Sequence, residues 1–192
     1  MTNTTDIEQK IIESAITCIE RFGLRDTTVR RIAQEAGVNV AAINYYFRSK
    51  EQLMERVMET TLDNAFDWSH FASSEDYTPK QRLADILDHM TKGAQMFPEI
   101  TRAHFIAPIL ERKDGSVMFG KCGEFMERVY EDLVKRGAEP GPELRQAVIQ
   151  AFSSTILGVG IFLNLYADFP KVDYRDPETR RNYIESIVDS LL

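Results

Sequence analysis

The chain has 192 residues, 43% of them hydrophobic, which is enough to bury a sizeable core in one domain or in a small domain joined to a larger one. Two cysteines are too few for a disulfide framework, and a formal net charge of −7 argues against general affinity for nucleic acid. The first residues show neither the basic nor the apolar region of a secretory signal, so we expect a cytoplasmic protein.

The charge is unevenly distributed along the chain. Residues 21–50 contain six basic and two acidic residues, whereas residues 51–192 contain 16 basic and 24 acidic residues. A small basic region on an acidic body suits a protein that meets DNA with one end only.

The first 50 residues show the pattern of three short helices. An apolar stripe over residues 12–22 predicts an amphipathic helix that ends at Gly23. Thr27 or Thr28 then caps a second helix, and Gly37 stops it because glycine adopts a left-handed conformation without a steric penalty. Asn39 caps a third helix, whose Ile43 and Phe47 point into the core. The second and third helices together predict a helix-turn-helix.

The outer face of the third helix is small and polar, as a helix in the major groove requires. We expect Asn44 and Tyr45 to reach bases or nearby phosphates, and Thr28, Arg30, Tyr46 and Lys50 to position the DNA backbone. The full set of predicted DNA-binding residues is Thr28, Arg30, Asn39, Val40, Ala41, Ala42, Asn44, Tyr45, Tyr46 and Lys50.

Helical periodicity continues through the rest of the chain. A long helix starts at Ser49, Pro79 begins another, and further helices follow up to the last one, which carries Ile184 and Val188. We expect about nine helices and no strand. The predicted domains are a helix-turn-helix DNA-binding domain over 1–50 and a larger helical ligand-binding and dimerisation domain over 51–192.

The segment 143–168 lacks charged residues between Arg145 and Asp168, a length that approaches the roughly 20 apolar residues of a membrane span. Scattered amides and hydroxyls, together with Gly158 and Gly160, make a helix buried against protein the better interpretation. A central core helix of a monomer and a dimer seam both remain open.

The middle helices are rich in large aromatic and methionine side chains. Each of them alone is explained by ordinary core packing, but together they fit a cavity for a lipophilic ligand. The residues predicted to line it are Phe66, Phe105, Phe125, Phe152 and Phe162.

Catalytic and metal-binding patterns are scarce. His70, His89 and His104 have no metal-ligand spacing with one another or with either cysteine, and there is no phosphate loop or nucleophile elbow. We expect neither an enzyme nor a bound metal or cofactor.

The segment from Ile7 to about Leu62 resembles the N-terminal domain of the TetR family of bacterial transcriptional regulators. The shared elements, in order, are Phe22-Gly23, Thr27-Thr28 through Ile32-Ala33, Ala36-Gly37-Val38, Tyr45-Tyr46-Phe47 and Ser49-Lys50-Glu51-Gln52-Leu53. Arg48 departs from the pattern, because many members carry glycine there. The rest of the chain resembles the family only in length and helical pattern.

This resemblance implies a homodimer on double-stranded operator DNA and a ligand cavity in the helices after the DNA-binding domain. It also implies that the last two helices pair with those of a second copy, with small residues allowing close approach. The predicted dimer interface is Ile156, Gly158, Val159, Gly160, Leu163, Ile184, Ile187 and Val188.

Three functions fit these patterns. The first is a repressor released by a small lipophilic effector, although the residues do not distinguish repression from activation. The second is a DNA-binding protein of the same fold with no effector, and the third is a helical interaction module or enzyme without a DNA role.

Overall fold

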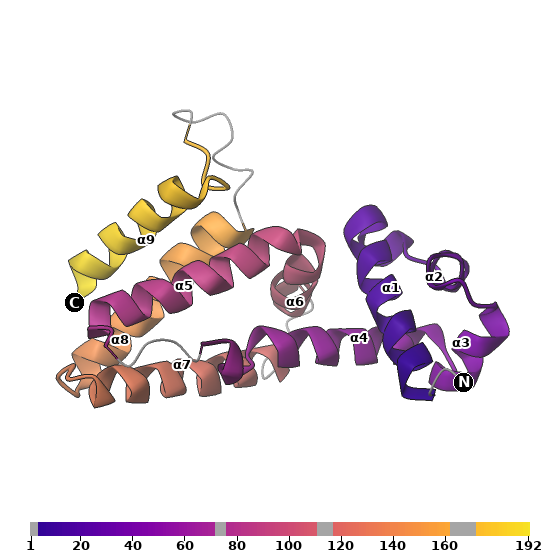
Figure 1. The fold of residues 1–192 in the computed structure, drawn as a ribbon, viewed down its shortest axis with the longest axis horizontal. Coiled ribbons are helices and arrows are strands. Elements are labelled where there is room, and N and C mark those ends of the chain that lie inside the picture. The colour runs from indigo at the N-terminus through magenta and orange to yellow at the C-terminus, as the bar shows by residue number, and fades with distance from the viewer. Residues whose placement is uncertain (1–3, 72–75, 111–116, 162–171) are drawn as a thin grey trace. The chain divides into compact units, whose positions relative to one another are not determined.

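The computed structural model describes residues 4–71, 76–110, 117–161 and 172–192, and in these ranges the chain is helical and contains no strand (Figure 1). The expected all-α class is confirmed. The α-helices are α1 (Thr4–Asp26), α2 (Val29–Ala36), α3 (Val40–Phe47), α4 (Lys50–Ala65), α5 (Pro79–Met96), α6 (Pro98–Leu110), α7 (Val117–Lys135), α8 (Pro142–Phe152) and α9 (Pro177–Leu191). A 3-10 helix, η1 (Trp68–Phe71), follows α4, and a π-helix, η2 (Ser153–Ile161), continues α8.

The helices form two compact units. The first unit is Met1–Asn64 together with Glu99–Lys113, and the second is Ala65–Pro98 together with Asp114–Leu192. The sequence pattern places a functional boundary at residue 50, whereas packing extends the first unit through α4 and adds α6 to it.

Helix α6 is held in the first unit by the end of α1. The Glu20 carboxylate accepts hydrogen bonds from the backbone N–H groups of Glu99 (3.1 Å) and Ile100 (2.8 Å). The first N–H groups of a helix lack partners within the helix, so this side chain satisfies two of them. The Ile100 side chain is buried in the same apolar cluster as residues of α1, α2, α3 and α4.

A buried histidine joins α6 to α4. The Thr61 hydroxyl lies 3.0 Å from the carbonyl oxygens of Val57 and Met58, to which it donates, and 2.8 Å from Nε2 of His104. Because the hydroxyl proton is used on its own helix, the imidazole N–H donates to Thr61. Burial lowers the pKa of His104 to about 4, so the ring is neutral at neutral pH.

The second unit is built around α5, which packs against α7, α9 and η2. A cluster of aromatic rings fills part of its interior, centred on the buried Phe125. The ring centroid of Phe125 lies 5.3 Å from that of Phe66, 5.6 Å from Trp68, 5.1 Å from Phe71 and 6.0 Å from Phe152. These separations are those of rings in direct contact.

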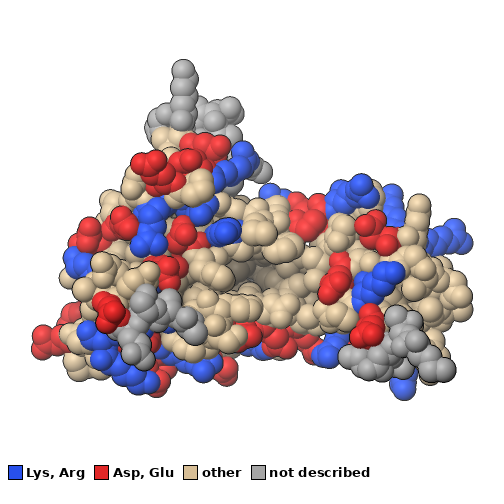
Figure 2. All heavy atoms as spheres, viewed as in Figure 1, with Lys and Arg blue, Asp and Glu red and all other residues tan. Residues whose placement is uncertain are grey.

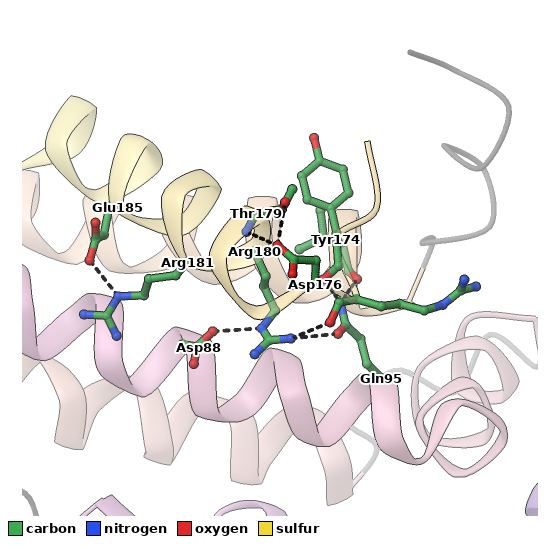
Figure 3. A network of polar contacts seen from close by, with 10 residues as sticks. Asp88, Gln95, Tyr174, Asp176, Thr179, Arg180, Arg181 and Glu185 are labelled. Carbon is green, nitrogen blue, oxygen red and sulfur yellow. Dashed lines mark hydrogen bonds and ion pairs between the residues drawn. The ribbon is translucent and has the colours of Figure 1, made fainter. Parts of the chain in front are cut away.

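Two buried arginines connect helices of this unit that are distant in sequence. Arg180 of α9 is 5% exposed; its Nε donates to Asp88 of α5 (2.8 Å) and its Nη1 to the amide oxygen of Gln95 (3.3 Å), as Figure 3 shows. Arg82 of α5 is 2% exposed and pairs with Asp132 of α7 at 2.7 Å. Each guanidinium therefore has a carboxylate partner, as a buried charge requires.

The helix expected over 143–168 is not regular throughout. It is an α-helix to Phe152 and a π-helix over η2, and the part beyond Ile161 lies outside the described residues. The Gln95 side-chain N–H donates to the carbonyls of Val159 (2.9 Å) and Tyr174 (3.1 Å), so contacts from α5 supplement the backbone bonds of η2. A Cβ at Gly160 would lie 3.2 Å from Cβ of Ala94, so a larger residue would force α5 to give way.

No described helix is long and apolar enough to cross a membrane.

Candidate nucleic-acid interface

Helix α2 begins and ends as its sequence predicts. Of the two threonines, Thr28 is the cap: its hydroxyl accepts from the N–H of Arg31 at 3.3 Å. Thr27 is buried and donates to the carbonyl of Gly23 at 2.8 Å. The side chain of Thr28 is exposed, so the N-terminus of α2 faces solvent.

The turn between α2 and α3 depends on one glycine. Gly37 has φ +64 and ψ 33, and its N–H bonds to Gln34 while the N–H of Val38 bonds to Ala33. This pair of bonds is the Schellman arrangement that ends helices. It turns the chain within a single residue and sets the start of α3.

Helix α3 has one buried face and one exposed face. Asn39 caps it by accepting from the N–H of Ala42 at 2.7 Å, as predicted. Ile43 and Phe47 are 1% and 5% exposed and lie in the core of the first unit. The helix is therefore fixed by its inner face and its outer residues are free to contact a ligand.

The exposed face of α3 carries the residues predicted to read bases. Tyr45 is 79% exposed, Val40 is 39% exposed, and Ala41 and Asn44 are also exposed, whereas Ala42 is half-buried. Of the residues predicted to contact the DNA backbone, Thr28 and Arg30 are exposed and Lys50 is half-buried. Asn39, which caps α3, is exposed as well. Tyr46 differs from Tyr45, because it packs against the core and meets the Tyr45 ring edge-on at 5.2 Å.

An open hollow at the corner between α1 and α2 is lined by three arginines, of which Arg30 was predicted to contact DNA. The guanidinium of Arg31 lies 4.2 Å from the centre of the Phe22 ring and donates to the carbonyl of Asp26 at 2.6 Å. Such stacking holds a guanidinium in place while leaving other N–H groups to solvent. The hollow is lined by Phe22, Arg25, Asp26, Thr28, Val29, Arg30 and Arg31.

Basic side chains are not confined to this region. Figure 2 shows Lys and Arg side chains interspersed with Asp and Glu over the visible face, with no single large basic patch.

Comparison with known proteins agrees with this geometry. Residues 11–57 match the family described as bacterial regulatory proteins, tetR family, a range that covers α2 and α3 with most of α1 and the first half of α4. The chain belongs to the TetR family.

Two relatives from Bacillus subtilis (strain 168) carry names of the same kind. The first, "Probable HTH-type transcriptional regulator YttP", is 49% identical over 135 residues, which are 67% of this chain and 65% of that protein. The second, "Uncharacterized HTH-type transcriptional regulator YfiR", is 24% identical over 95% of this chain and 92% of its own length. Both relatives are thus named as transcriptional regulators rather than as enzymes.

Solved structures share the fold across the whole chain. A TetR transcription regulator from Haloarcula marismortui ATCC 43049 superposes with a TM-score of 0.73 and 21% identity, covering 98% of this chain and 99% of that one. A TetR transcriptional regulator from Legionella pneumophila gives a TM-score of 0.67 and 17% identity over 99% and 97%. At these identities the likeness concerns the TetR-family fold alone.

The predicted ligand-lining residues are only partly brought together. Phe66, Phe125 and Phe152 lie in the ring cluster of the second unit. Phe105 is half-buried in α6, which belongs to the first unit, and Phe162 lies outside the described residues. No group of three or more metal-ligating side chains occurs in the described ranges.

The residues predicted at the dimer interface are largely buried within the single chain. Ile156, Val159, Ile184 and Val188 are 7%, 1%, 0% and 1% exposed. Their apolar pattern is thus explained by the packing of η2 and α9 against α5. Gly160 is buried as well, Gly158 and Ile187 are half-buried, and Leu163 lies outside the described residues. By contrast, Ile149 of α8 is 53% exposed, although periodicity did not distinguish it.

Proposed function

We propose that this protein is a cytoplasmic repressor that binds a palindromic operator as a homodimer and is released by a small lipophilic effector. The observation that carries the DNA-binding part is the division of α3 into two faces. Ile43 and Phe47 fix the helix to the core, while Asn44 and Tyr45 stand exposed on a face of small residues. A helix held in this way suits insertion into a major groove.

In this proposal each protomer places α3 in one half-site, with the half-site centres about one helical turn apart or somewhat more. The Asn44 amide and the Tyr45 phenol contact base edges or nearby phosphates. Thr28, Arg30 and Lys50 contact phosphates, and these contacts set the register of the protein on DNA without reading sequence.

The test compares Tyr45→Ala with Lys50→Ala on DNA from upstream of the protein's own gene and on a random duplex of equal length. Tyr45→Ala should reduce the preference for the upstream DNA, because a base contact is lost. Lys50→Ala should weaken both duplexes about equally and flatten the salt dependence by roughly one unit for each lost phosphate contact. Unchanged discrimination in Tyr45→Ala would show that α3 is oriented differently.

The dimer is proposed to use the outer faces of α8 and α9. Since Val159 and Val188 are buried in one chain, the surface available to a second copy is what α8 and α9 leave exposed, including the half-exposed Ile149. Ile149→Asp would place a carboxylate in that contact and should give monomers that remain folded. Sedimentation measures the oligomer, and circular dichroism measures the folding.

Effector release is proposed to act through α4 and α6. Both belong largely to the first unit. The chain leaves this unit after Asn64, at the end of α4, and re-enters it from the second unit at Glu99, at the start of α6. A ligand that prefers one arrangement of the second unit biases these connections by its differential affinity. Weakening operator binding a hundredfold requires a coupling of about 2.7 kcal/mol, which a buried apolar ligand is able to supply.

A panel of hydrophobic compounds tests this step through Trp68, the single tryptophan of the chain, which lies in the ring cluster. A true effector should change Trp68 fluorescence, raise the melting temperature and weaken operator binding together. A compound that raises the melting temperature but leaves operator affinity unchanged would show binding without coupling.

A DNA-binding protein without an effector is the second candidate. It is favoured by the aromatic cluster around Phe125. The neighbouring ring centroids lie 5.1 to 6.0 Å from that of Phe125, so these side chains pack directly on one another. Should no compound change either readout, this function becomes the better one.

A further inference from the structure

The connection between the recognition helix α3 and the long helix α4 contains a strained residue. Arg48 has φ +60 and ψ −43 and is the single non-glycine residue with positive φ in the described part of the chain. The N–H of Ser49 donates to the carbonyl of Phe47 at 2.6 Å, across one residue. Arg48 is therefore the central residue of a γ-turn with positive φ. This turn is rare and strained, and any residue that has a side chain adopts it at a cost in free energy.

Neighbouring contacts force this turn on the chain. On one side Phe47 is anchored in the core at 5% exposure, and the N–H of Arg48 still bonds to the carbonyl of Asn44 at 2.9 Å. On the other side the Ser49 hydroxyl accepts from the N–H of Gln52 at 3.2 Å, and Leu53 is fully buried. Two helices with fixed inner faces are thus joined by only two residues, Arg48 and Ser49, and glycine would occupy position 48 at lower cost.

The Arg48 side chain has no local structural role that accounts for this cost. It is exposed, and within the described ranges no ion pair involves it. Between Ala36 and Met54 the sequence contains one acidic residue, Glu51, against the two basic residues Arg48 and Lys50. The position lies one residue past the end of α3 and four past Asn44, at the border of the proposed DNA-reading face.

We propose that Arg48 binds a DNA backbone phosphate at the edge of the half-site, and that the strained turn is retained because it carries this guanidinium. The inference rests on the proposed DNA binding and adds a contact to it. Arginine suits the task, since its planar fork donates two N–H groups to one phosphate. The contact carries no sequence information, so it strengthens binding to every duplex alike.

The experiment uses the full chain, three variants at this position and a fluorescein-labelled random duplex of roughly 30 base pairs, long enough for two half-sites. Arg48→Gln removes the charge and keeps the strained side chain, Arg48→Gly removes both, and Arg48→Lys keeps a charge. Arg56→Gln is the matched control, because Arg56 is an exposed arginine of the same unit that pairs with Glu59 at 3.5 Å on α4. Affinity is measured from 50 to 200 mM salt, and melting temperature without DNA.

Arg48→Gln and Arg48→Gly should both weaken binding about fivefold at 0.15 M salt per bound protomer and lower the salt slope by about 0.9 per protomer. Arg48→Lys should keep most of the slope. Without DNA, Arg48→Gly should melt about 2–4 °C above Arg48→Gln, because the strain is relieved.

A salt slope for Arg48→Gln no lower than that of Arg56→Gln would overturn the phosphate contact. A melting temperature for Arg48→Gly no higher than that of Arg48→Gln would overturn the strain. If the unmodified protein fails to bind the duplex at 50 mM salt, the proposed DNA binding itself is wrong, and the two failures are thereby distinguished.

Discussion

In the first unit the described buried side chains include no arginine or lysine, whereas the second unit buries Arg82 and Arg180 at 2% and 5% exposure. The first unit is assembled around a cluster of apolar side chains from α1, α2, α3, α4 and α6, and several of its polar groups act as helix caps. The second unit joins α5 to α7 and α9 through ion pairs between residues 50 and 92 positions apart.

The two units therefore differ in the contacts that set the arrangement of their helices. Apolar contacts are non-directional, so α1, α2 and α3 depend on caps and a glycine turn to set their angles. A buried guanidinium accepts few geometries, because a misplaced partner leaves an uncompensated charge. We therefore expect the second unit to be more sensitive to polar substitutions and the first to changes at turns.

Introducing a charge into the interior of the second unit should have the largest effect. Val159→Asp places a carboxylate at a position that is 1% exposed within one chain, so it should lower the free energy of unfolding by about 3–5 kcal/mol or give insoluble protein. Ile149→Asp, at a position 53% exposed, should cost less than about 1 kcal/mol. A folded, monomeric Val159→Asp variant would instead place Val159 in the dimer contact.

Breaking the α5–α9 ion pair should cost nearly as much. Asp88→Ala leaves Arg180 buried without its carboxylate, and we expect a loss of about 3 kcal/mol in urea denaturation followed by Trp68 fluorescence. Glu185→Ala is the matched control on the same helix, since its partner Arg181 is 36% exposed (Figure 3). That surface pair should contribute less than about 1 kcal/mol. Equal losses in the two variants would contradict the special role of the buried pair.

The first unit should respond to pH through His104. Burial lowers its pKa to about 4, so the unfolded chain, with an ordinary histidine pKa near 6.5, takes up the proton more readily. The contribution of neutral His104 to the free energy of unfolding is therefore fully present above pH 6.5. It is lost as the pH falls from 6.5 towards 4, which lowers the free energy of unfolding by up to about 3 kcal/mol.

Hydrogen exchange of α1 amides at pH 7 and pH 5 reports on this unit. His104→Gln keeps a donor for Thr61 without the titration and should abolish most of the difference. Identical pH dependence in both proteins would assign the effect to other groups.

The smallest effects should come from two helix ends with the same geometry, one in each unit. Gly37 (φ +64) ends α2 and Gly137 (φ +98) follows α7, and both show the paired Schellman hydrogen bonds. A Cβ would meet nothing closer than 3.9 Å at either position, so the penalty for alanine comes from the backbone alone, about 1–2 kcal/mol each. Gly37→Ala should destabilise only the first unit and Gly137→Ala only the second, as hydrogen exchange resolves. Loss of protection in both units from either variant would show that they unfold together.

The sequence by itself determined the helix-turn-helix. The cap Asn39, a threonine cap at position 27 or 28 that the structure assigns to Thr28, the turn at Gly37 and the buried face of α3 all follow from short spacings along the chain, which helical geometry dictates. The exposure of Tyr45 follows from the same rule, because a residue two positions after Ile43 lies on the opposite side of the helix. The aromatic excess likewise identified Phe66, Phe125 and Phe152, although not how they meet.

Only the tertiary structure decided which helices share a unit and which apolar faces are internal. Glu20 and Ile100 are 80 residues apart, and no local pattern shows that one caps the helix of the other. The same applies to Val159 and Ile184. Their apolar character alone fits a dimer interface as well as a core, and the structure shows that they are buried within one chain, where α5 packs against their helices. A periodic apolar face shows that a helix is covered, but its partner depends on packing between distant segments, which spacing along one helix does not encode.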